Sequence, residues 1–196
     1  MRHILHGLFV LGMGLAPVLI APPFLQAAWA QSQLQQNEAL KQLLDRAAQY
    51  TQQGKLQQAI ATLQQALKLA RQLQDQSSES LVLVIIGTNL RNTGKTQQAL
   101  EYYNQALSIV QAVGDRRGEA VTLNNIGGVY SDLGQLQQAL EYYNQALPIR
   151  QAIGDRRGEA VTLNNIGGVY SDLGQLQQAL TFYKQALPSS KRCVIG

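Results

Sequence analysis

An internal repeat constrains the fold of this chain more than any other feature. Residues 114–140 recur without a change at residues 154–180. The same offset, applied towards the N-terminus, finds two diverged copies, which begin at Gly94 and Gly54. A period of about 20–50 residues is typical of proteins in which similar units stack in a row. The sequence therefore predicts four stacked units rather than one globular core.

Each unit has the pattern of two amphipathic helices. In the third unit, Leu123, Ile126 and Tyr130 are spaced by three and four residues, as on one face of a helix. Gly134 follows, as glycine often does at a helix C-terminus, and a second apolar stripe starts at Leu136. We expect first helices at residues 34–52, 77–92, 116–132 and 156–172, and second helices at residues 55–73, 95–112, 135–152 and 175–188. Since one hairpin cannot bury its stripe alone, we predict an all-α fold, an α-solenoid of stacked helix-turn-helix repeats.

The residues of these stripes also resemble a known family. The pattern in the third unit is Leu123, Ile126, Gly127, Tyr130, Gly134, Ala139, Tyr143 and Ala146, and the fourth unit repeats it from Leu163 to Ala186. It resembles the tetratricopeptide repeat (TPR) in its long, 40-residue variety, which occurs in kinesin light chains, G-protein signalling modulators and many bacterial multi-repeat proteins. The resemblance implies a right-handed TPR superhelix. Its repeats would be residues 77–114, 115–154 and 155–188, with a divergent N-terminal repeat at residues 34–74 and an irregular tail at residues 189–196.

Two tyrosines and one aspartate of the third unit have expected structural roles. We expect Tyr130 and Tyr143 to fill the gaps between units, because large rings can bridge neighbouring helix pairs. Asp115 follows Gly114 directly and is expected to cap the N-terminus of the next first helix.

Residues 1–30 have the pattern of a secretory signal. Arg2 precedes an apolar stretch at about residues 8–20, and residues 28–30 (Ala-Trp-Ala) supply small residues before a cleavage point. We therefore expect residues 1–30 to be a signal peptide and the mature chain to be exported, to the periplasm or the extracellular space, without membrane insertion. The alternative is an uncleaved membrane anchor, because the largely apolar residues 4–25 are numerous enough to span a bilayer.

Catalytic chemistry is not predicted. The chain has two histidines, His3 and His6, and one cysteine, Cys193. Removal of the signal would leave no histidine as a general base or metal ligand, and a single cysteine excludes a disulfide framework and a cysteine-based zinc site. The sequence contains neither a phosphate-binding loop nor a Gly-x-Ser-x-Gly motif. We therefore predict a protein that is not an enzyme and that holds no cofactor or metal.

Nucleic-acid binding is not predicted either. Without Arg2 the chain carries 15 basic and 12 acidic residues, a net charge of +3, whereas nucleic-acid binding needs a wide uncompensated basic patch. Two arginine pairs, residues 116–117 and 156–157, are flanked by acidic residues. We interpret them as solvated turn charges, and the alternative is an edge that attracts an acidic partner.

The candidate binding residues belong to the first helices. In TPR proteins the first helices line the concave face, so the resemblance implies a peptide-binding groove there. The predicted peptide-binding residues are Asn124, Asn125, Asn164, Asn165, Ser131, Ser171, Thr88 and Arg91. An amide group can donate to and accept from the backbone of an extended peptide. The alternative is that the asparagines form a structural ladder between neighbouring first helices. Gly128 and Gly168 are expected to leave open room in the groove.

We therefore predict a protein–protein interaction scaffold that binds a peptide or protein segment. One alternative is a structural, self-associating module or the remnant of a longer TPR array, because after Leu187 the sequence departs from the repeat and supplies no capping helix. The uncapped C-terminal repeat would then mediate self-association. A second alternative is the targeting arm of an enzyme that another chain supplies.

Overall fold

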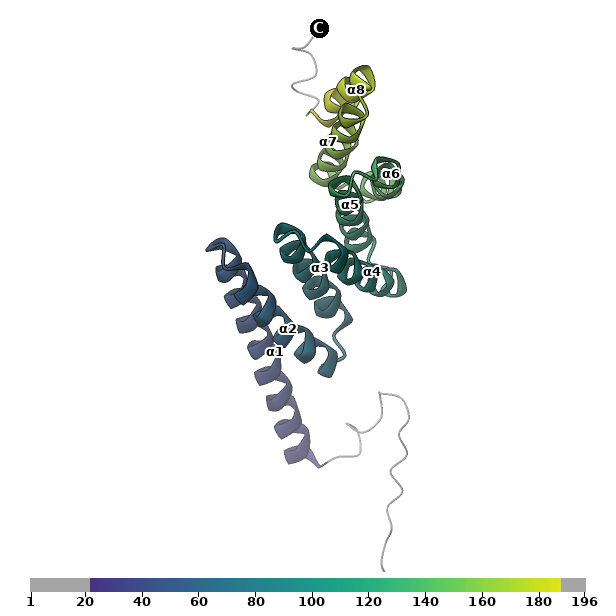
Figure 1. The fold of residues 1–196 in the computed structure, drawn as a ribbon. Helices are drawn as coiled ribbons and strands as arrows, with labels where there is room; N and C mark the ends of the chain where they lie inside the picture. Colours follow the sequence, from purple (N-terminus) through teal and green to yellow (C-terminus); the bar gives the residue numbers. More distant parts are fainter. Residues whose placement is uncertain (1–21, 188–196) are drawn as a thin grey trace, which may run out of the picture. The chain divides into compact units, whose positions relative to one another are not determined.

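The computed structural model describes residues 22–187, which form eight α-helices and no β-strand. The first helices of successive repeats are α1 (Pro23–Gln52), α3 (Gln76–Asn92), α5 (Arg116–Asp132) and α7 (Arg156–Asp172). The second helices are α2 (Leu56–Gln72), α4 (Thr96–Val113), α6 (Leu136–Ala152) and α8 (Leu176–Ala186). Figure 1 shows these helices in chain order, joined by short turns. The all-α prediction is confirmed, and from α2 onwards the helices begin and end within two residues of the expected positions.

Helix α1 begins at Pro23 rather than at residue 34. Proline is favourable in the first turn of a helix, where its missing N–H has no partner in any case, and the alanine, leucine and glutamine residues that follow favour helix. The helix therefore continues through the predicted cleavage point after Ala30, and the greater part of the predicted signal lies outside the described residues. Among residues 22–187, no helix has the length and hydropathy needed to cross a membrane. The chain divides into two units, residues 1–39 and 40–196, and the packing described below is that of the second unit.

The turns between helices recur at a regular interval along the chain. Six of them hold a glycine in the left-handed region, with φ between 69° and 76°: Gly54, Gly94, Gly114, Gly134, Gly154 and Gly174. The remaining position in this series is Gln74, whose φ is 55°. An aspartate then caps each first helix from α3 onwards: the side chains of Asp75, Asp115 and Asp155 accept hydrogen bonds from the backbone N–H groups of Ser78, Gly118 and Gly158. The predicted cap at Asp115 is confirmed.

Each first helix from α3 onwards packs on the second helix of its own repeat and on the second helix before it. The close approach within a repeat depends on a glycine of the first helix that faces a tyrosine of the second. A Cβ atom at Gly127 would lie 2.7 Å from the ring of Tyr143, and the same distance separates Gly87 from Tyr103. Such a contact is too short for any side chain, so glycine allows the ring to lie directly against the helix backbone.

The two tyrosines expected between units differ in position. Tyr143 is 3% exposed and lies in an apolar cluster with Ile166 and Val169 of the next repeat, as predicted. Tyr130 is only half-buried, and its ring stacks on Tyr142 of α6, with ring centroids 5.3 Å apart and an interplanar angle of 11°. Tyr130 also packs against two apolar clusters, one that includes Leu100 of the preceding repeat and one that includes Ile166 of the next, so it lies between units as predicted.

The last described repeat exposes apolar side chains that the preceding repeat buries. Leu180 and Tyr183 of α8 are 46% and 39% exposed, whereas their equivalents Leu140 and Tyr143 of α6 are 6% and 3% exposed. Helix α7 covers the side chains of α6. Residues 188–196, which include the predicted tail at 189–196, lie outside the described residues.

Candidate functional site

The predicted binding residues lie on α3, α5 and α7. These helices lie side by side, because α5 contacts both α3 and α7, and we call the surface that they share the first-helix face. Asn164, Ser171 and Thr88 are exposed, Asn125, Asn165, Ser131 and Arg91 are half-buried, and Asn124 is buried. The eight residues are therefore not equivalent, although their sequence pattern is repetitive.

Asn124 takes part in a contact between two first helices. Its Oδ1 atom accepts a hydrogen bond from Thr162 Oγ1 at 3.1 Å and another from Asn165 Nδ2 at 3.2 Å. Asn124 is on α5, and both donors are on α7. This geometry fits the ladder interpretation for Asn124 and Asn165. A peptide-binding role for the four asparagines stays a prediction, and Asn164 is the one whose side chain is exposed.

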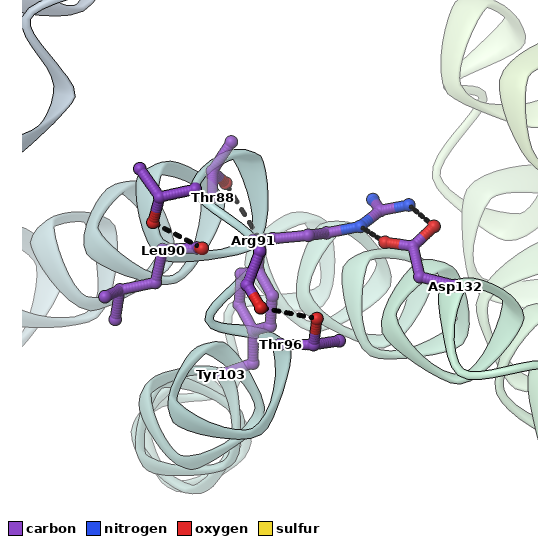
Figure 2. A network of polar contacts seen from close by, with 8 residues as sticks. Thr88, Leu90, Arg91, Thr96, Tyr103 and Asp132 are labelled. Carbon is purple, nitrogen blue, oxygen red and sulfur yellow. Dashed lines mark hydrogen bonds and ion pairs between the residues drawn. The ribbon is translucent and has the colours of Figure 1, made fainter.

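Arg91 and Asp132 join α3 to α5 by a two-pronged ion pair. Arg91 Nε lies 2.5 Å from Asp132 Oδ2, and Arg91 Nη2 lies 2.9 Å from Asp132 Oδ1. Figure 2 shows the arginine side chain as it extends from its helix to this carboxylate. The hydrogen bonds from Arg91 to Asp132 raise the pKa of the arginine further above its ordinary value. Paired hydrogen bonds of this kind fix the orientation of a guanidinium group as well as attracting it.

The ion pair fills the space that the sequence predicted to be open at Gly128. A Cβ atom at Gly128 would lie 2.6 Å from Arg91 Nη1, so a glycine is needed for the guanidinium to lie there. The expectation of open room is wrong for Gly128, because a side chain from the preceding repeat occupies it. At Gly168 it is confirmed, since the nearest atom outside the helix backbone is Tyr183 Oη at 3.8 Å.

Two phenol groups lie near the same ion pair. The hydroxyl of Tyr103 is 3.0 Å from Thr88 Oγ1, a contact in which either oxygen can donate (Figure 2). Burial raises the pKa of Tyr103, and burial raises the pKa of Tyr143 to about 12. Both tyrosines are therefore neutral at physiological pH, and Tyr103 acts as a hydrogen-bonding group rather than as a charge.

One arginine of each pair at the turns is compensated by a glutamate. Arg116 forms an ion pair with Glu119, and Arg156 forms one with Glu159 at 3.1 Å. This agrees with their interpretation as turn charges. Among the described residues, no group of three or more histidine, cysteine, aspartate or glutamate side chains could hold a metal ion.

A depression of about 410 Å³ lies on a different part of the surface, over the second helices α2 and α4. Its lining includes Gln64, Lys95, Gln98, Glu101 and Tyr102. No sequence motif marks this place, because glutamine, lysine and glutamate are common on the exposed side of any helix. Its lining lacks the asparagine, serine and threonine residues predicted to bind a peptide.

Stacked helical hairpins with a polar first-helix face define an α-solenoid repeat protein. The sequence matches the tetratricopeptide repeat family over residues 37–112, 78–152 and 118–192. The chain belongs to this family, whose repeats typically serve in protein–protein interaction scaffolds, and the resemblance seen in the sequence is confirmed. No curated protein sequence matches the chain.

Several solved structures share this fold at low sequence identity. BtubC (BKLC) from P. vanneervenii is 20% identical with a TM-score of 0.68, over 84% of this chain and 74% of that chain. Aspartyl phosphate phosphatase F from Bacillus subtilis is 16% identical with a TM-score of 0.74, over 81% of this chain and 42% of that chain. A kinesin-light-chain protein of nearly identical TPR-like repeats from P. anserina is 19% identical with a TM-score of 0.67, over 81% of this chain and 77% of that chain. These similarities establish the fold and no activity.

Proposed function

We propose that this protein is an exported, non-catalytic scaffold that binds a peptide or an extended protein segment on its first-helix face. The observation that carries the proposal is the exposure of Asn164 and Ser171 on one first helix, α7. Hydroxyl and amide groups can each donate and accept hydrogen bonds. Exposed groups of this kind can pair with the backbone of an extended peptide whatever its sequence.

The asparagines of the first-helix face have different roles. The hydrogen bonds of Asn124 to Thr162 and Asn165 hold α5 and α7 in register. The amide of Asn164 has no hydrogen-bond partner among residues 22–187 and is exposed to solvent. Asn164 and Ser171, two turns apart on α7, are therefore the groups that we expect to contact a bound peptide.

Selection of binders from a displayed library of random peptides tests this function. For a peptide selected on the full chain, the double variant Asn164→Ala, Ser171→Ala should raise the dissociation constant about ten-fold, because each lost hydrogen bond is worth about 0.5–1.5 kcal/mol. The matched control is Asn144→Ala, which removes an exposed asparagine from the second helix α6 and should leave binding unchanged. If the control weakens binding and the double variant does not, the peptide contacts the second helices, and the proposal fails.

Export rests on the signal-like pattern of residues 1–30 and has its own test. Mass spectrometry of the protein from the source cells should find Gln31, free or cyclised, as the first residue. Recovery of chains that begin at Met1 from the membrane fraction would support the anchor instead.

The exposed apolar side chains of α8 favour self-association as a second candidate function. Leu176, Leu180 and Tyr183 are 68%, 46% and 39% exposed, and exposed apolar patches mark interaction surfaces. Sedimentation velocity should then show dimers that dissociate on dilution, and Leu180→Glu should shift the population to monomer. A wild-type chain that remains monomeric at high concentration would rule this candidate out.

A further inference from the structure

Two sites on the first-helix face share one sequence but differ in what the preceding repeat supplies. The Gly128 site consists of Gly128 and Asp132 on α5 together with Arg91 from α3. The Gly168 site, at the equivalent place in the next repeat, consists of Gly168 and Asp172 on α7 together with Ser131 from α5. Because residues 114–140 and 154–180 are identical, the glycine and the carboxylate are the same in both sites.

The Gly128 site shows which group this arrangement holds. The guanidinium of Arg91 lies over Gly128, where a Cβ atom would be 2.6 Å from its Nη1 atom. It makes two hydrogen bonds to Asp132, of 2.5 and 2.9 Å, and it interacts electrostatically with the phenols of Tyr103 and Tyr143. The site thus combines a space beside a glycine and a carboxylate, which together hold one planar cation.

The Gly168 site has the same parts without the cation. Among residues 22–187 and outside the helix's own backbone, the one atom that a Cβ at Gly168 would meet within 4 Å is Tyr183 Oη, at 3.8 Å. Asp172 is exposed and has no ion pair among residues 22–187. Ser131 stands where Arg91 stands in the other site, and its short side chain does not reach the carboxylate.

We propose that the Gly168 site binds the arginine side chain of a separate peptide, in the place that Arg91 takes at the Gly128 site. A guanidinium is planar and donates two parallel hydrogen bonds to one carboxylate, whereas an ammonium group is a point charge. The chain itself shows the complete arrangement at Asp132. This inference rests on the proposed function, since it names a residue that a peptide on the first-helix face should carry.

The test uses a pair of short acetylated peptides that differ in one functional group. One carries a central arginine, and the other carries citrulline, which has nearly the same shape but a neutral urea group in place of the guanidinium. Titration of the isotope-labelled full chain by NMR should shift the backbone amide signals of Gly168 and Asp172 with the arginine peptide. The citrulline peptide should bind at least about ten-fold more weakly, because the charge-assisted hydrogen bonds are lost.

Three variants of the protein test whether the NMR shifts arise from binding at the Gly168 site. Ser131→Arg supplies an internal arginine to the Gly168 site and should prevent the shifts, and Asp172→Asn should reduce binding of the arginine peptide about ten-fold. Arg91→Ser should open the Gly128 site and add shifts at Gly128. The proposal is overturned if the arginine peptide leaves Gly168 unshifted into the millimolar range, if citrulline binds equally well, or if Ser131→Arg has no effect.

One further measurement distinguishes a separate peptide from the chain's own tail, and another distinguishes this inference from the proposed function. The tail carries Lys191 and Arg192, so the variant Lys191→Ser, Arg192→Ser is titrated in parallel. Shifts seen only in that variant would mean that the tail itself fills the site, which overturns the proposal of a separate peptide. An arginine peptide that leaves Gly168 unshifted, while selected peptides still bind the first-helix face, would refute the inference and leave the proposed function intact. Selected peptides that bind only the second helices, while the arginine peptide still shifts Gly168, would refute the proposed function alone.

Discussion

Replacement of the buried Arg150 by valine is expected to stabilise the protein by about 1–2 kcal/mol. Arg150 is on α6 and is 6% exposed. The equivalent residues of earlier repeats are Val110, 2% exposed, and Ala70, fully buried. A charged side chain therefore occupies a position that the same fold elsewhere fills with an apolar one.

The magnitude follows from the contacts of the arginine. Its Nη1 atom forms an ion pair with Asp155 Oδ2 at 2.9 Å, but its buried Nε atom has no hydrogen-bond partner among the described residues. An unpaired buried donor costs about 1–3 kcal/mol, and replacement of a buried ion pair by apolar residues is often neutral or stabilising by about 1–4 kcal/mol. Asp155 would still accept the hydrogen bond from the backbone N–H of Gly158 at 3.0 Å, so its charge is not left without a partner. The gain is reduced because valine is smaller than arginine and fills less of the space.

Urea denaturation followed by circular dichroism measures the effect, and amide hydrogen exchange in α6 and α7 locates it, since repeat arrays can depart from two-state unfolding. The reciprocal variant Val110→Arg has Asp115 available as a partner and should destabilise the protein by at least about 1 kcal/mol. A loss of more than about 1 kcal/mol in Arg150→Val would show that the ion pair contributes more than its desolvation costs, which would refute the reasoning.

Three more variants or conditions have expected outcomes. Gln74→Gly should raise the free energy of unfolding by about 0.5–1 kcal/mol in urea, because a non-glycine side chain is strained at a φ of 55°. Asn124→Ala should lower it by about 1–2 kcal/mol, whereas Asn164→Ala, on an exposed position, should leave it nearly unchanged. The backbone hydrogen bond from Gly158 lowers the pKa of Asp155 below its ordinary value, so this contribution to stability is present above about pH 4 and is lost as the pH falls further. An acid titration of stability in which Asp155→Asn falls as steeply as wild type would contradict this.

The sequence was sufficient for the helices because their signals are local and repeated. The spacing of Leu123, Ile126 and Tyr130 and the glycine at each turn are features of a few consecutive residues, and they determine where a helix starts and ends. The same reasoning failed at α1, where two local signals compete. The apolar, alanine-rich residues before Gln31 are typical of a signal peptide, yet the same composition favours the helix that begins at Pro23.

The contents of the candidate site were harder to predict because they depend on residues from different repeats. Arg91 and Asp132 are on different first helices, and Arg91 belongs to a more diverged repeat, so the repeat pattern gives no reason to pair them. Likewise, the sequence places Asn124 beside the apolar stripe of its helix, but its burial depends on Thr162 and Asn165 of the next repeat. The spacing of residues within a helix predicts the side of the helix on which a side chain lies. It does not predict which side chains of the neighbouring repeat will contact it.

Identical repeats therefore do not create identical sites, since the surroundings of each first helix come from the repeats on either side. Asn124 is 8% exposed because α7 supplies its partners, while Asn164, in the same sequence context on α7, is exposed. Gly128 is covered by an arginine from the repeat before it, and Gly168 is not. A polar group or a space that the neighbouring repeat fills at α5 is thus available to a binding partner at the equivalent position of α7. Binding is expected to concentrate on α7 for this reason, because Asn164 is exposed and the space beside Gly168 is open there.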